Sequence, residues 1–145
     1  MRLRIRSERG SAILETALAL PLLMLAGVGV VEFGRAYQTS QVLASAAREG
    51  ARVAVLQNSA AAAVDAKVRH YLQMGGLTSD GTVGVTTAAV AADSVAKAPG
   101  SEVTISYPFQ FVVLQPVAQL LVSGSLIDSP ITVTATSVMR NEAGS

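Results

Sequence analysis

The chain of 145 residues contains no cysteine, no tryptophan and a single histidine. Without cysteine it can form no disulfide, no thiolate metal site and no thiol nucleophile. His70 cannot hold a metal alone, and Ser59 and Asp65 precede it on the same expected helix, where the three would not converge as a catalytic triad. Charged residues make up 14% of the chain and aromatic residues 4%. We therefore expect a protein that is not an enzyme and that has no cofactor and no metal site.

The positive charge of the chain is concentrated at its N-terminus. Residues 1–10 hold four arginines and one glutamate, whereas residues 11–145 hold seven basic and nine acidic residues. The formal net charge of +1 therefore comes from a basic N-terminal segment and not from a binding face. No basic patch with interleaved aromatic residues remains, so nucleic acid is not an expected partner.

Half of the residues are hydrophobic, and residues 16–31 carry no charged side chain. Together with residues 11–14 they make an apolar segment of roughly 20 residues, the length that crosses a bilayer as a helix. Because the basic residues precede this segment, the N-terminus is expected in the cytoplasm and the remainder is expected to be exported. A cleaved secretory signal peptide is an alternative, since "ASA" at residues 44–46 has the small residues of a cleavage site, but that site lies far beyond the apolar segment.

Glu15 stands inside this apolar segment. A carboxylate at the centre of a membrane helix costs roughly 2.5–3.5 kcal/mol, so an acidic residue there indicates a function and a partner. Gly10 ends the basic segment and is followed by Ser11-Ala12-Ile13-Leu14-Glu15. This pattern resembles the leader of type IV prepilins, in which a peptidase cuts after the glycine and a glutamate is the fifth residue of the mature chain. The resemblance implies cleavage after Gly10, with Gly10, Ser11 and Glu15 as the processing residues.

Two further stretches, "VEFGRAY" at residues 31–37 and "AAREGARVA" at residues 46–54, resemble the TadE-like family of pilus assembly proteins. Members of that family are pseudopilins of the tight-adherence (Tad) system, a relative of type IV pili. The resemblance covers residues 6–56. It implies a minor pseudopilin in the bacterial inner membrane, either remaining there or entering the pilus. The implied partners are a prepilin peptidase, other pseudopilins or pilin subunits, the inner-membrane pilus platform and the lipid bilayer. The alternative is an uncleaved, membrane-anchored binding module.

The same region is expected to form one long helix, from about Ala12 to Leu56, that protrudes from the membrane. Glutamate and arginine recur three residues apart with the acid first, which favours ion pairs along the helix. Small residues at intervals of four around Gly50 allow another helix to approach closely. The residues predicted to contact assembly partners are Glu15, Glu32, Arg35, Arg48, Glu49, Gly50 and Arg52. The alternative for residues 46–52 is a solvated helix face held by ion pairs.

The remaining sequence predicts a second helix and a small sheet. The segment 59–74 has helical periodicity, with Asn58 or Ser59 as a possible N-cap and Gly75-Gly76 as the C-terminal stop. Its expected buried residues are Ala62, Val64, Val68, Tyr71 and Leu72, and Asp65 and Arg69 are expected to pair. Apolar and polar residues then alternate in "EVTISYPFQF" (102–111), in "ITVTATSVM" (131–139) and, more weakly, in "TVGVTT" (82–87), which predicts an antiparallel sheet. Pro108 predicts an edge or a bulge.

These patterns together predict an α+β protein. Its expected parts are a basic leader (1–10), the membrane-spanning half of the N-terminal helix (11–31), the protruding half (32–57) and an exported α+β domain (58–145). Residues 112–123 are apolar and uncharged but too short to span a bilayer. They either close the core of the domain, the alternative that we prefer, or rest on the membrane surface beside the helix.

Overall fold

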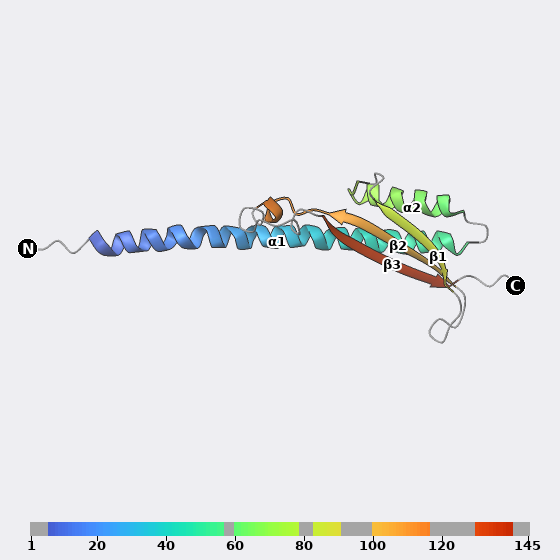
Figure 1. Ribbon diagram of the computed structural model, residues 1–145, viewed down its shortest axis with the longest axis horizontal. Coiled ribbons are helices and arrows are strands. Elements are labelled where there is room, and N and C mark those ends of the chain that lie inside the picture. Colours follow the sequence, from blue (N-terminus) through green and yellow to red (C-terminus); the bar gives the residue numbers. More distant parts are fainter. Residues whose placement is uncertain (1–5, 57–59, 79–82, 91–99, 117–129, 141–145) are drawn as a thin grey trace, which may run out of the picture.

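The computed structural model describes residues 6–56, 60–78, 83–90, 100–116 and 130–140. Within them the chain forms two long helices and one sheet, and residues 114–116 are also helical (Figure 1). In chain order the elements are α1 (Arg6–Ala54), α2 (Ala61–Met74), β1 (Gly84–Val90), β2 (Gly100–Phe109) and β3 (Ile131–Arg140). The α2 helix and the sheet flank the C-terminal half of α1, and its N-terminal half extends away from them (Figure 1). The predicted α+β fold class and order of elements are confirmed.

The α1 helix has 49 residues, which corresponds to about 74 Å at a rise of 1.5 Å per residue. It begins at Arg6 and ends at Ala54, whereas the sequence predicted Ala12 and Leu56. Alanine and leucine dominate its first half and favour a helix strongly enough that it continues through Pro21. At the other end, the amide of Leu56 donates to the carbonyl of Val53 at 3.2 Å, so the last turn tightens into an i→i−3 bond and the helix stops.

The α2 helix buries one stripe and ends at two glycines, as predicted. Val64, Val68 and Leu72 are fully buried at intervals of four residues. After Met74, the amide of Gly76 donates to the carbonyl of Gln73 and the amide of Leu77 to the carbonyl of Leu72. These two bonds form a Schellman motif, which needs the positive φ of 74° that Gly76 adopts.

Two details of α2 differ from the prediction. Ala62 is exposed, because it lies off the stripe of Val64, Val68 and Leu72. The N-cap is Ala60, which makes no side-chain capping bond. The predicted caps, Asn58 and Ser59, lie outside the described residues. The predicted ion pair is present, with Arg69 Nε 2.8 Å from Asp65 Oδ2.

The sheet is antiparallel with the order β1-β2-β3, so β2 is central. The alternation predicted for β2 is confirmed, since Val103, Ile105 and Phe109 are buried. Pro108 pairs with Thr132 of β3 but lies beyond the last β1 pair, Gly84 with Ser106. It therefore occupies a local edge, where a proline breaks no continuous ladder. The weakly patterned strand lies at Gly84–Val90, displaced from the predicted 82–87.

The core lies where α1, α2 and the inner face of the sheet meet. It consists of fully or nearly fully buried residues from α1 (Leu43, Ala46, Ala47, Ala51), from α2 (Val64, Val68, Leu72) and from the sheet and its approach (Val83, Val103, Ile105). Gly50 sits at the centre of this contact. A Cβ placed on it would lie 2.7 Å from Cγ2 of Val68 and 3.2 Å from Cγ1 of Val103. The small residues of α1 thus let α2 of the same chain approach closely.

Candidate functional site

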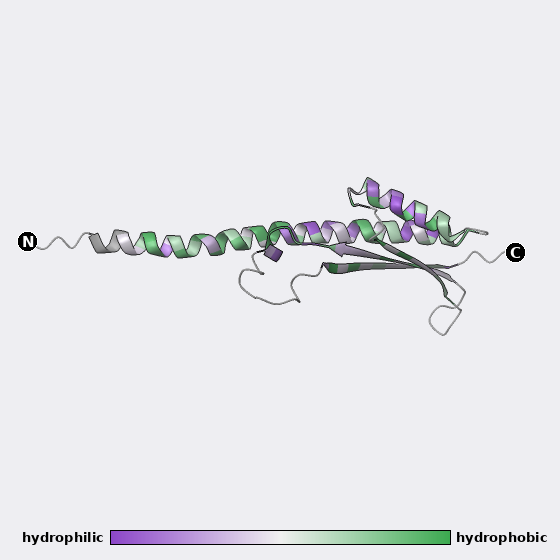
Figure 2. Ribbon diagram, turned by 45° about the horizontal axis from the view of Figure 1, so that its top comes forward, coloured by the Kyte–Doolittle hydropathy of each residue, from purple (hydrophilic) through white to green (hydrophobic). Residues whose placement is uncertain are grey.

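The N-terminal half of α1 exposes its apolar side chains on every side. Ile13 is 70% exposed, Leu18 67% and Leu23 71%. Among the described residues, α1 is the one helix that is long enough and apolar enough to cross a membrane. The rest of the chain buries none of its most apolar 18-residue stretch. The hydrophobic colouring along this half contrasts with the mixed colouring of the rest of α1 (Figure 2). Because the domain does not cover this surface, the helix has the properties of a single membrane anchor.

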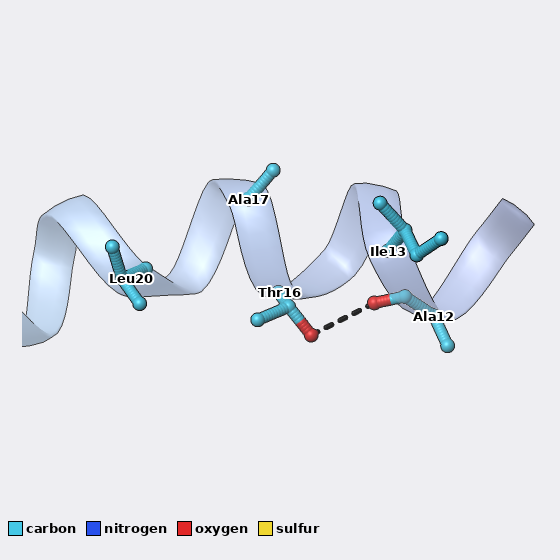
Figure 3. A pocket seen from close by; sticks show the side chains of 5 residues that line it. All are labelled: Ala12, Ile13, Thr16, Ala17 and Leu20. Atoms are coloured by element: carbon cyan, nitrogen blue, oxygen red, sulfur yellow. Dashed lines mark hydrogen bonds between the residues drawn. The ribbon is translucent and has the colours of Figure 1, made fainter.

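The predicted processing residues lie near the start of α1. Gly10, Ser11 and Glu15 are all exposed there, and nothing lies within 4 Å of a Cβ placed on Gly10. Among the described residues, Glu15 has no ion-pair or side-chain hydrogen-bond partner. One side of the helix near Glu15 is lined by Ala12, Ile13, Thr16, Ala17 and Leu20 (Figure 3).

The hydroxyl of Thr16 on this side donates to the carbonyl of Ala12 at 2.8 Å (Figure 3). The only hydroxyl on this patch is therefore satisfied within the helix, as an apolar environment requires. With Ala12, Thr16 and Ala17 on the same side, the helix presents a shallow, small-residue surface to which a second helix could pack closely.

Glu32, one of the predicted partner-contact residues, is held inside the chain. It is 3% exposed although it stands just past the apolar segment of α1. Its carboxylate accepts the backbone amide of Val112 through both oxygens, at 3.1 and 3.2 Å, and the amide of Val113 at 3.0 Å. Arg35 Nη1 lies 3.3 Å from Oε2, so the predicted ion pair of Glu32 and Arg35 is present. We call this arrangement the Glu32 clamp, because it fixes the segment after β2 to α1.

All three phenylalanines of the chain gather beside the Glu32 clamp. The ring of Phe111 contacts Phe33 with centroids 6.0 Å apart and Phe109 with centroids 5.2 Å apart, both edge to face. The guanidinium of Arg35 lies 5.7 Å from the centre of the Phe109 ring. An aromatic cluster and an ion pair therefore meet where the membrane helix joins the domain. The sequence pattern assigns Phe109 and Phe111 to one face of a strand but gives no sign of this junction.

The remaining predicted partner-contact residues divide between the surface and the interior. Arg48 and Arg52 are exposed on α1, and Arg48 reaches Ser45 Oγ at 3.3 Å. The spacing of Glu49 and Arg52 predicts an ion pair between them. In the structure Glu49 pairs instead with Lys67 of α2, with Oε1 of Glu49 3.8 Å from Nζ of Lys67. Gly50 is enclosed by α2 and β2. Within the segment 46–52, Glu49 and Gly50 thus face α2, whereas Arg48 and Arg52 are exposed to solvent.

Val112 and Val113 do not close the core, which was the preferred role for residues 112–123. Val112 is 63% exposed and Val113 41% exposed, whereas Leu114 is half-buried. Their amides point to Glu32, and this directs their side chains away from the core. Residues 117–123 lie outside the described residues. No group of three or more metal-binding side chains is found in the described part of the chain, and His70 is exposed there.

A family model described as TadE-like protein matches residues 10–52. This range begins at the predicted cleavage glycine and contains every residue predicted for processing or partner contact. A search of the curated proteins and a search of the solved structures give no match.

Proposed function

Residues 10–52 belong to the TadE-like family, and on this premise we propose that the protein is a minor pseudopilin of a Tad-type pilus, matured by a prepilin peptidase. Family membership implies a component of Tad pilus assembly. The observation that carries the more specific proposal is the exposed N-terminal half of α1, with Glu15 unpaired among the described residues. A helix of this kind is suited first to a bilayer and then to a bundle of similar helices.

Maturation is proposed to remove residues 1–10. The bond between Gly10 and Ser11 lies near the start of α1, and a peptidase must unwind the helix there to reach it. Glycine lowers the cost of unwinding by about 0.5–1 kcal/mol relative to alanine. The position of Gly10, with no packing around it, supports cleavage at this bond.

Intact-mass measurement of the protein extracted from membranes tests this step. We expect the mass of residues 11–145 in cells that contain the peptidase and the full mass in cells that lack it. Replacement of Gly10 by valine should block cleavage, whereas replacement of Gly27, which is equally unpacked and lies within the span, should not. Full-length protein in peptidase-containing cells would contradict the pseudopilin role and favour the uncleaved binding module.

Glu15 is proposed to act in assembly after cleavage. The midpoint of residues 11–31 is residue 21, so Glu15 lies about 9 Å from the centre of the span, inside the hydrocarbon region. A charge at this depth requires a partner. The ammonium of Ser11, created by cleavage, is the simplest one. Within one chain Ser11 and Glu15 are separated by about 6 Å along the helix axis, which favours the amine of a neighbouring subunit.

Co-purification of partner subunits, together with a count of surface pili, tests the role of Glu15. Glu15→Ala and Glu15→Gln should both be cleaved and inserted but should lose partner subunits, because neither carries a charge. Glu15→Asp should retain part of the association. Leu18→Ala is the matched control, since Leu18 is also exposed one turn away and its loss removes no charge. Wild-type pili in Glu15→Ala would refute this role.

The proposed topology places the N-terminus in the cytoplasm and the domain outside the inner membrane. Four arginines precede the apolar segment, and Arg35 is the first basic residue after it. This asymmetry favours retention of the N-terminus. A reporter that is active only in the periplasm, fused after Ser145, should be active, and a reporter that is active only in the cytoplasm should be silent. The exposed Arg48 and Arg52 would then face partner subunits on the outer side.

A further inference from the structure

The segment that follows β2 is attached to α1 at the level of Glu32. Its two consecutive amides, those of Val112 and Val113, both donate to the carboxylate of Glu32. The turn that begins at residue 112 lies beside the middle of α1, at the end of the sheet that faces the N-terminal half of the helix (Figure 1). The position of this segment along α1 is therefore fixed by hydrogen bonds and by the contact of Phe111 with Phe33.

The depth of this segment follows from helix geometry. Residue 32 lies eleven residues beyond residue 21, the midpoint of the span, or about 16 Å along the axis. The hydrocarbon core of a bilayer extends about 15 Å from its centre. Side chains on a helix also tilt toward its N-terminus, so the carboxylate of Glu32 lies closer to the bilayer than its own Cα. Val112 and Val113 therefore lie at the boundary between hydrocarbon and headgroups.

Several properties of the segment fit this depth. Its apolar side chains point outward, with Val112 63% exposed and Val113 41%, and Phe33 of the adjoining α1 is 66% exposed. The bend at residues 112 and 113 donates two amides to one buried carboxylate, which satisfies backbone groups that have no partner in a helix or strand where water is scarce. From Phe111 to Ile127 the sequence contains no charged residue.

We propose that Phe33, Val112 and Val113 form a membrane-contact surface, here called the junction patch, which inserts into the outer boundary of the bilayer. The partner is the lipid itself. The Glu32 clamp holds the junction patch against α1, so the domain rests on the membrane in one orientation and does not swing about the end of its anchor. The proposal depends on the membrane anchor but not on a role in pilus assembly.

Depth-dependent fluorescence of single-cysteine variants tests the junction patch, because the chain has no cysteine of its own. The full chain is reconstituted alone in vesicles of phosphatidylethanolamine and phosphatidylglycerol. Val112→Cys is labelled with the environment-sensitive dye nitrobenzoxadiazole. Leu22→Cys reports the middle of the span. Val138→Cys is the matched surface control, since Val138 is 52% exposed and pairs with Glu102, seven residues along β2 from Phe109. That distance is about 23 Å along the strand.

The depth of each label is measured by comparing its quenching by nitroxide-labelled lipids with its quenching by iodide in the aqueous phase. We expect a label at Val112 to be quenched by lipids that carry a nitroxide near the headgroup and to lose most of its quenching by aqueous iodide. A label at Val138 should show the opposite. Quenching of both labels by iodide to the same extent would overturn the proposal. Protection of Val112 from iodide without quenching by the nitroxide lipid would also overturn it, because a second protein copy would then cover the patch.

A second variant tests the Glu32 clamp separately. Glu32→Gln keeps the size of the side chain but removes its charge and replaces one of its two acceptor oxygens by an NH2 donor, which weakens the bonds from both amides. In this background the nitroxide quenching at Val112 should fall toward that at Val138, and quenching at Leu22 should not change. Unchanged quenching at Val112 would show that the Glu32 clamp does not set the position of the junction patch. Cleavage and pilus assembly do not enter this measurement, so its failure would leave the proposed function standing.

Discussion

Replacement of Gly50 by alanine is the most direct test of how α1 and α2 pack. The new methyl group would lie 2.7 Å from Cγ2 of Val68 and 3.2 Å from Cγ1 of Val103. Carbon atoms in favourable contact are about 3.5–4.0 Å apart, so α2 would have to move by about 1 Å. Val68 is fully buried, and its branched side chain has one strongly preferred rotamer in a helix, so it cannot rotate away.

The expected free-energy change has two terms. Overpacking of a core costs about 1–3 kcal/mol. Alanine is also more favourable than glycine in a helix by about 1 kcal/mol. This gain contributes only to a transition in which α1 itself unfolds. For detachment of α2 from an intact α1 the full cost of about 1–3 kcal/mol applies. This corresponds to an increase of about 5- to 150-fold in the opening equilibrium. For unfolding that includes α1 the net loss is about 0–2 kcal/mol.

Hydrogen exchange of the α2 amides, measured by mass spectrometry on the full chain in detergent, reports this opening. Gly34→Ala is the matched control, since Gly34 lies in the same helix and a Cβ placed on it would have nothing within 4 Å. We expect faster exchange of α2 in Gly50→Ala and no change in Gly34→Ala. Adding Val68→Ala should reduce the effect of Gly50→Ala, because it removes the clashing methyl group. Equal exchange in the two glycine variants would refute the close packing.

Three further predictions concern the stability of the domain, each measured as the free energy of unfolding. Gly76→Ala should destabilise it by about 1–2 kcal/mol because the φ of 74° is unfavourable for a side chain, and Gly76→Asn should cost less; equal losses would contradict the Schellman motif. Leu72→Ala should cost about 2–5 kcal/mol, whereas Met74→Ala, at a position 72% exposed, should stay within about 0.5 kcal/mol. Asp65→Asn should cost only about 0.3–0.5 kcal/mol, because the pair with Arg69 is partly exposed; a loss above about 1 kcal/mol would show a larger role for Asp65.

Local patterns in the sequence were enough to predict most of the fold. The period of two in β2 placed Val103 and Ile105 in the core, and the glycine pair at the end of α2 marked its stop. These features depend on neighbours within a few residues, so a sequence pattern contains them. The predicted range of β1 differed from the observed one because its residues are small and alternate weakly. The register of β1 is set by pairing with β2.

Features that depend on distant parts of the chain could not be predicted in the same way. The small residues around Gly50 indicated a close helix contact, but no local pattern could distinguish a partner subunit from α2 of the same chain. Glu49 had an arginine three residues away and yet lies near Lys67, because α2 brings that lysine alongside α1. The Glu32 clamp joins residues eighty positions apart in sequence. Its acceptor was visible as an acid next to an apolar segment, but its donors are backbone amides, which have no sequence signature.

Glu15 and Glu32 look alike in the sequence, since each is a lone acid at an apolar stretch. In the structure they differ in whether the described residues supply a partner for the carboxylate. A charge removed from water needs hydrogen bonds or an opposite charge. Glu32 obtains two amides and Arg35 within its own chain. Glu15 has no such partner among the described residues, and the proposed function assigns it the amine of another subunit. Glu32→Gln should therefore change the position of the domain in a single reconstituted chain, whereas Glu15→Gln should leave the single chain unchanged and remove its partner subunits on co-purification. Loss of partners from Glu32→Gln with an undisturbed domain would place both acids in the assembly contact.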